Sequence, residues 1–135
     1  MFEWTHTVTT PATPEEVWQL YADVQRWLEW DSGLSHVSLD GDFAAGSSGT
    51  MVVEGQPPLT WTLVEVTENV SFTDVTELPG MATLTFSHRV EPTPEGSAIT
   101  HGVRIEGPAA AKLGPMVISD TPEAMEMLAR IAAAT

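Results

Sequence analysis

The feature that most constrains the fold is the segment from residue 34 to residue 106, in which apolar and polar side chains alternate in short runs. Alternation places every second side chain on one face, so each run predicts a half-buried β-strand. The runs predict strands at about 34–39, 49–54, 58–66, 70–77, 81–90 and 97–106. Turn-forming residues separate them, and short connections of this kind favour antiparallel hairpins within one sheet.

A further strand and two short helices precede this segment. Residues 2–9 alternate with a period of two and predict the additional strand. Thr13 can then act as a helix N-cap, and Glu16 stands three residues later, as in a capping box. Asp23 can cap a second short helix over 24–30. The region after the first strand is therefore expected to fold as two short helices.

The end of the chain changes to a helical pattern that is rich in Ala, Met, Leu and Ile. Pro115 and Pro122 would each break or kink a single helix, because proline lacks the backbone N–H. Thr121 can cap a fresh helix, so we expect the final helix at 122–133. The chain as a whole predicts an α+β fold, with helices on one face of a seven-stranded antiparallel sheet. One helix cannot cover such a sheet fully, so a gap that could hold a ligand is expected.

The length and composition of the chain limit the functions that we expect of it. At 135 residues we expect one domain, spanning 1–135. A net charge of −14, from 19 acidic and 5 basic residues, argues against nucleic acid as a partner. The absence of cysteine excludes disulfides and thiolate chemistry. No signal peptide or membrane-spanning run is visible, so we expect a cytoplasmic protein. GxSxG and phosphate-loop motifs are missing, which argues against a serine hydrolase and nucleotide binding.

Three of the four histidines fall in step with apolar neighbours on predicted strands. His88 shares its phase with Phe86 and Val90, and His101 shares its phase with three β-branched residues; His6 lies in the first strand. A buried imidazole needs a hydrogen-bond partner or a wet cavity. The histidines are therefore either partnered core residues or part of the lining of a hollow.

Several motifs together resemble the START/birch-pollen-allergen-like (SRPBCC) superfamily, in its bacterial polyketide cyclase/dehydrase branch. The motifs are PATPEEVWQLYADVQRWLEW at 11–30, FTDVTELPG at 72–80, FSHRVEP at 86–92 and ITHGVRIEGP at 99–108, with the kinked terminal helix. The resemblance implies a helix-grip fold, in which a curved sheet surrounds the C-terminal helix with an apolar cavity between them. Members include aromatic polyketide cyclases and dehydratases, carriers of lipids and hormones, and proteins without a known ligand.

In the helix-grip arrangement the first strand lies beside the last, and the last beside the one before it. His6, His101 and His88 then lie on three adjacent strands and can form a row, with opposed Cβ atoms about 4.5–5.5 Å apart. Asp74 is the candidate carboxylate partner, although it could equally face water at a strand end. We interpret the row in three ways: histidines bonded to each other, water or hydroxyls such as Thr85 and Thr100; an acid–base site; or a three-histidine zinc site.

The candidate catalytic residues are His88, His101, His6 and Asp74, with no metal ligand and no cofactor assigned. Candidate ligand-binding residues are apolar: Trp4, Trp61, Phe72, Met81, Phe86, Met116, Met125 and Leu128. The phase of Trp61 is ambiguous, because Leu63 on one side of its strand competes with Val64 and Val66 for the inner face.

We expect a protein that binds a small hydrophobic or aromatic molecule, as a monomer or homodimer. If it is an enzyme, the resemblance, together with the histidines, implies histidine-assisted aldol-type cyclisation or dehydration. The alternatives are a non-catalytic carrier or sensor of lipid-like ligands and a partner-binding module.

Overall fold

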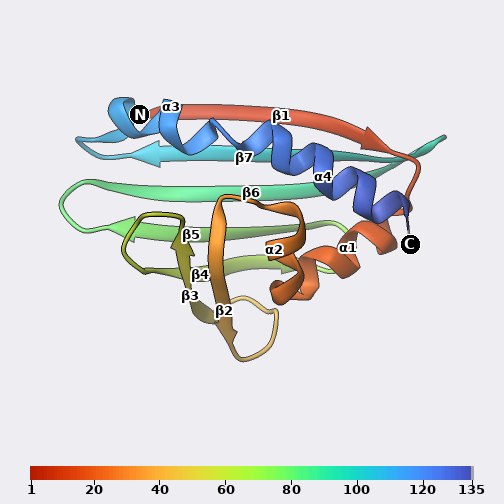
Figure 1. Cartoon of the computed structure of the whole chain (residues 1–135), viewed down its shortest axis with the longest axis horizontal. Helices are drawn as coiled ribbons and strands as arrows, with labels where there is room; N and C mark the ends of the chain where they lie inside the picture. The colour runs from red at the N-terminus through yellow and green to blue at the C-terminus, as the bar shows by residue number, and fades with distance from the viewer. Residues whose placement is uncertain (135) are drawn as a thin grey trace.

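The computed structural model describes residues 1–134 and forms one curved sheet with helices on its concave face (Figure 1). The strands are β1 (Phe2–Thr10), β2 (Leu34–Asp40), β3 (Ser48–Val53), β4 (Leu59–Thr67), β5 (Ser71–Leu78), β6 (Ala82–Thr93) and β7 (Gly96–Glu106). The helices are α1 (Pro14–Ala22), η1 (Val24–Arg26, a 3₁₀ turn), α2 (Trp27–Trp30), α3 (Ala110–Ile118) and α4 (Thr121–Ala133). The predicted α+β helix-grip fold is confirmed.

The sheet has the order β1-β7-β6-β5-β4-β3-β2, and every neighbouring pair is antiparallel. Helix α4 packs on β1 and also contacts α1 and α2, so the sheet curves around it. Figure 1 shows α3 and α4 lying along β1 and β7, with α1 and α2 on the same side of the sheet. No helix within residues 1–134 is long and apolar enough to cross a membrane.

The helix N-caps that were predicted from the sequence are only partly present in the structure. The predicted capping box is present: Thr13 Oγ1 accepts from the Glu16 N–H at 3.2 Å, and Glu16 Oε1 accepts from the Thr13 N–H at 2.9 Å. Asp23 stands before η1, but its side chain makes no capping hydrogen bond, so this prediction was wrong. The prediction for Thr121 was also wrong, because this residue is already helical and Asp120 occupies the N-cap position.

The two prolines near the C-terminus have different effects. Pro115 lies inside α3 without ending it, whereas the chain breaks ahead of Pro122. The break lies there because proline is tolerated in the first turn of a helix, where its missing N–H would have no partner. Gly114 lets α3 approach the sheet closely, since a Cβ at this position would overlap the ring of Phe2.

A β-bulge resolves the ambiguous phase of β4. The register with β5 shifts between Leu63 and Glu65, so one additional residue is inserted there. Trp61 and Leu63 lie on the inner face before the bulge, and Val66 packs on the core after it. The inserted Val64 is 52% exposed. Members of both competing sets therefore face inwards, Trp61 and Leu63 before the bulge and Val66 after it, whereas Val64 does not.

The buried apolar side chains form two separate clusters. The main cluster lies between the sheet and helices α1, α2 and α4, and its fully buried members include Tyr21, Trp61, Phe72, Met125 and Leu128. The end cluster lies beneath α3 and includes Ala82, Leu84, Val103, Ile105 and Ala110.

Aromatic and aliphatic side chains, among them Trp27, Trp61 and Phe72, occupy much of the space between the sheet and the helices. The hollows that the described residues form most clearly lie on the surface, at the β5–β6 turn and over the outer face of β4 and β5. The expectation of a cavity there rested on counting helices against strands, and neither surface hollow is that cavity. It took no account of the indole rings of Trp27 and Trp30, which pack inwards from α2.

Candidate functional site

Three imidazoles lie side by side on the concave face of the sheet. His6 of β1 pairs with His101 of β7, and His101 pairs with His88 of β6. The ring centroids of His88 and His101 are 4.6 Å apart, with the ring planes at 73°. His6 also stacks on Trp4, its neighbour on the same face, at 5.7 Å. The direct pairing of the three histidines, which the sequence allowed, is therefore present in the structure.

The imidazoles belong to a line of polar side chains that crosses four strands and separates the two apolar clusters. We call this line the polar row; its members are His6, His101, His88, Asp74 and Thr76. On β1, Trp4 packs with the end cluster and Val8 with the main cluster, on either side of His6. The same change occurs on β6, where Phe86 and Val90 flank His88. Apolar packing is therefore interrupted along this line.

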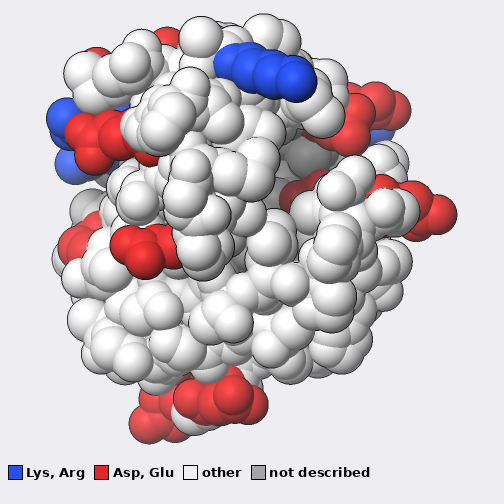
Figure 2. Space-filling model, turned by 90° about the vertical axis from the view of Figure 1, so that its left-hand side faces the viewer, with Lys and Arg blue, Asp and Glu red and all other residues white. Residues whose placement is uncertain are grey.

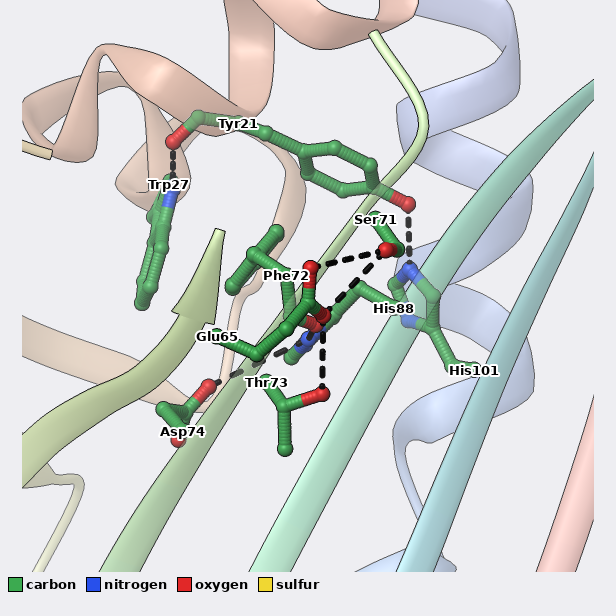
Figure 3. Close-up of polar contacts among 9 residues, drawn as sticks. All are labelled: Tyr21, Trp27, Glu65, Ser71, Phe72, Thr73, Asp74, His88 and His101. Carbon is green, nitrogen blue, oxygen red and sulfur yellow. Dashed lines mark hydrogen bonds and ion pairs between the residues drawn. The ribbon is translucent and has the colours of Figure 1, made fainter. Parts of the chain in front are cut away.

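The buried partner of His101 is the chain's single tyrosine. Tyr21 Oη and His101 Nε2 are 2.7 Å apart, and α1 presents Tyr21 from its buried face (Figure 3). We assign the hydroxyl as the donor, because it has no other acceptor among the described residues. Burial raises the pKa of Tyr21 above its ordinary value, so the hydroxyl keeps its proton. The neutral imidazole then carries its hydrogen on Nδ1.

The hydroxyl partners expected from the sequence were wrong. Thr100 and Thr85 have the opposite phase from the histidines on their strands, so they lie on the convex face. Thr100 bonds there to Thr7, with 2.9 Å between the two hydroxyl oxygens.

His88 is fixed by a hydrogen bond and by stacking. Its Nδ1–H donates to the carbonyl oxygen of Phe72 at 3.2 Å, and its ring lies parallel to the Phe72 ring, with centroids 3.9 Å apart. Because Nδ1 carries the hydrogen, Nε2 keeps a free lone pair. Burial lowers the pKa of His88 to about 3. Burial, with the neighbouring His88 and His6, also lowers the pKa of His101 well below its ordinary value.

Asp74 lies beside His88 and is buried, at 3% exposure. Its Oδ2 is 3.9 Å from His88 Nδ1, which is longer than a hydrogen bond (Figure 3). Burial raises the pKa of Asp74 to about 8, so near pH 7 the proton resides on the carboxyl group and both buried imidazoles are neutral. The row therefore holds a neutral acid beside neutral bases.

These shifts make stability depend on pH in opposite directions. An aspartate ionises near 3.8 when unfolded and Asp74 near 8 when folded, so its contribution is complete below pH 3.8 and is lost as the pH rises through 8. The pKa of His88 falls from 6.5 to about 3, so its contribution is present above pH 6.5 and is lost as the pH falls towards 3.

The geometry does not favour the three-histidine metal interpretation. His101 Nε2 is occupied by Tyr21, and His88 Nδ1 is occupied by the Phe72 carbonyl. Within residues 1–134, no group of three or more His, Cys, Asp or Glu side chains is arranged to hold a metal ion.

The eight predicted ligand-binding residues divide into three groups. Four are fully buried in the main cluster: Trp61, Phe72, Met125 and Leu128. Trp4 and Phe86 are half-buried beside the polar row, in the end cluster. Met81 and Met116 are 49% and 64% exposed, so their placement inside was wrong. Met81 lies in the β5–β6 turn, and Met116 lies on the side of α3 opposite the buried Ala110 and Gly114.

Sequence reasoning missed two residues of the site. Tyr21 was not recognised as the partner of His101, although a buried tyrosine usually finds a partner for its hydroxyl group. Thr76 was not considered, although it shares the phase of Asp74 two residues earlier. A polar residue at an inner position of a strand is the signal that could have identified it.

Comparison with known proteins identifies relatives over the whole chain. The family model described as "Polyketide cyclase / dehydrase and lipid transport" matches residues 1–133. No curated protein sequence matches. Among solved structures, protein MLL2253 from Mesorhizobium loti superposes with a TM-score of 0.80 at 16% identity, covering 99% of this chain and 98% of that one. Truncated norcoclaurine synthase from Thalictrum flavum gives 0.77 at 12% identity, covering 96% and 92%. Ara h 8.0201 gives 0.77 at 12%, covering 99% of each chain.

Proposed function

The chain belongs to the polyketide cyclase/dehydrase and lipid transport family, and we propose that it binds a small apolar or aromatic molecule along the polar row. The observation that carries the proposal is the line of polar side chains between two apolar clusters, of which Asp74, Thr76 and His101 are buried. Ligand sites combine apolar walls with a few polar groups that fix orientation, and the row offers this combination.

Binding requires the two clusters to separate, because side chains fill the interior. Separating the two clusters at the polar row disrupts the least apolar packing, because neither cluster extends across the row. Trp4, His6 and Phe86 are only half-buried at this boundary and offer a way in. Figure 2 shows the end of the molecule that carries α3 and the β5–β6 turn, where the middle of the face is uncharged and acidic side chains lie towards the rim. An apolar ligand can approach this end without displacing ions.

As an enzyme, the protein would catalyse aldol-type cyclisation or dehydration of a carbonyl compound. In dehydration of a β-hydroxyketone, His88 Nε2 takes the proton from the carbon beside the carbonyl group. The C–H electron pair forms the new C=C bond as the C–O bond breaks, and the hydroxide leaves as water with the proton of Asp74. Release of the Nε2 proton from His88 to water and uptake of a proton from water by the Asp74 carboxylate restore both groups to their starting forms, while His88 Nδ1–H stays bonded to the Phe72 carbonyl. In cyclisation the same base generates the enolate that attacks a second carbonyl.

The remaining imidazoles have supporting roles in this proposal. His101 exchanges a proton with the substrate through Nδ1, while Tyr21 holds its Nε2. His6 faces His101 across the β1–β7 pair and orients it. The role of His101 uses the neutral imidazole, the form that burial favours for this residue.

A carrier of lipid-like molecules is the second candidate. The observation that favours it is the absence of charge along the inner part of the row, where burial keeps Asp74, His88 and His101 neutral. Such a surface suits a neutral cargo, and binding requires no proton transfer.

Turnover of an aromatic β-hydroxyketone distinguishes the two candidates. We would use 4-hydroxy-4-(2-naphthyl)butan-2-one, whose dehydration to the conjugated enone is followed by absorbance, and measure binding by tryptophan fluorescence. The enzyme predicts turnover that His88→Ala abolishes while binding persists, with His36→Ala, at an exposed position, as the matched control. Binding without turnover in the wild-type protein would support the carrier. Failure to bind this compound and native lipids alike would refute the proposal.

A further inference from the structure

Three buried polar atoms have no hydrogen-bond partner among the described residues: Trp30 Nε1, Trp61 Nε1 and Thr76 Oγ1. Two of them belong to neighbouring side chains, because Trp61 of β4 pairs directly with Thr76 of β5. Opposed residues in antiparallel strands have Cβ atoms about 4.5–5.5 Å apart and share a face of the sheet. An indole N–H and a hydroxyl group are therefore buried together without a partner.

Such a pair requires an explanation, since most buried polar side-chain atoms in proteins are hydrogen-bonded. Trp61 is 0% exposed and Thr76 is 1% exposed, so bulk water does not reach them. Valine has nearly the shape of threonine and carries no polar atom. The Thr76 hydroxyl thus contributes nothing to packing that valine could not supply, and the two unpartnered polar atoms suit a partner from outside the chain.

The location of the pair matches the boundary between the two clusters. Trp61 packs in the main cluster, with its ring 5.0 Å from that of Trp27. Thr76 lies between Trp61 and Leu84, and Leu84 belongs to the end cluster. Asp74 precedes Thr76 by two residues on the same face of β5. A ligand that separates the clusters at the polar row would therefore meet this pair beyond the imidazoles.

We propose that Trp61 and Thr76 form a second polar contact point, which binds an acceptor oxygen of the ligand through the indole N–H and the threonine hydroxyl. The inference rests on the proposed function and specifies its ligand class. An indole N–H can only donate, so the group it meets must be an acceptor such as a carbonyl or ether oxygen. The ligand is then a neutral, extended apolar compound with oxygens at two separate positions, one at the imidazoles and one at the Trp61–Thr76 pair.

Two matched probes test the second contact point. 2,6-Diacetylnaphthalene carries an acceptor at each end, and 2-acetyl-6-ethylnaphthalene replaces one carbonyl with a methylene group. The wild-type protein is expected to bind the diacetyl compound five- to tenfold more tightly, by titration calorimetry. Thr76→Val should reduce this preference by weakening the binding of the diacetyl compound, and Thr76→Ser, which keeps a hydroxyl group, should retain it.

The outcomes separate this inference from the function on which it rests. If both probes bind with one affinity in all three proteins, the second contact point is refuted and the ligand site stands. If neither probe binds, the proposed function fails with it. Unliganded Thr76→Val should also be at least as stable as the wild type, because it removes an unpaired buried hydroxyl. A lower melting temperature would show that the hydroxyl already has a partner and would overturn the inference.

Discussion

Tyr21→Phe removes the hydroxyl that joins helix α1 to the polar row. The Oη–Nε2 distance of 2.7 Å indicates a short hydrogen bond, and both residues are buried, with Tyr21 at 0% and His101 at 5% exposure. Phenylalanine keeps the ring contacts, including the edge-on contact with Phe72 at 4.9 Å. The change therefore isolates the hydroxyl and leaves a buried imidazole nitrogen without a partner.

An unpartnered buried polar group costs about 1–3 kcal/mol. In a domain of this size, 1 kcal/mol lowers the melting temperature by about 3–5 °C. Tyr21→Phe is therefore expected to lower the melting temperature by roughly 5–10 °C, measured by circular dichroism at pH 7.

The matched control removes a hydrogen bond of similar length from the convex face. Thr7→Val deletes the exposed bond between Thr7 and Thr100, where water replaces the lost partner, and it should change the free energy of unfolding by less than about 0.5 kcal/mol. If Tyr21→Phe shifts the melting temperature no more than Thr7→Val does, the Tyr21–His101 bond does not stabilise the fold, and the reasoning about the row is wrong.

Two further predictions concern Asp74 and helix α3. Between pH 6.5 and 8 the free energy of unfolding of the wild type should fall as the pH rises. In this range the unfolded chain has already lost the Asp74 proton, whereas the folded protein keeps it until about pH 8. Asp74→Asn should flatten this slope in melting curves at the two pH values, and an unchanged slope would contradict the assigned protonation. Gly114→Ala should cost about 1–3 kcal/mol in chemical denaturation, because its Cβ overlaps the Phe2 ring. Combining it with Phe2→Leu should recover part of the loss, and equal stability of the single and double variants would refute that contact.

The sequence predicted the elements whose causes are local. The strands follow from alternation, and the start of α1 follows from the capping box at Thr13 and Glu16. The shared face of His6, His88 and His101 also follows from strand phase. Their register does not, because it depends on where each hairpin turns, and a slip of two residues would have kept the same phase.

The features that the sequence could not predict depend on residues far apart in the chain. Tyr21 and His101 are 80 positions apart, and only the assembled fold brings them together. The bulge at Leu63–Glu65 depends on the pairing partner β5 as much as on β4 itself. The packed interior results from the volumes of indole rings that α2 directs inwards, such as that of Trp27, and no count of helices and strands contains this information.

The central claim, that a ligand binds along the polar row, is tested most directly by imidazole NMR. The chain has four histidines, three in the row and His36 at an exposed position on β2, which serves as an internal control. During titration with 2,6-diacetylnaphthalene, the ¹⁵N signals of His6, His88 and His101 should shift together with one saturation curve, while those of His36 stay unchanged. Saturable binding that moves His36 alone, or none of the four, would contradict the claim.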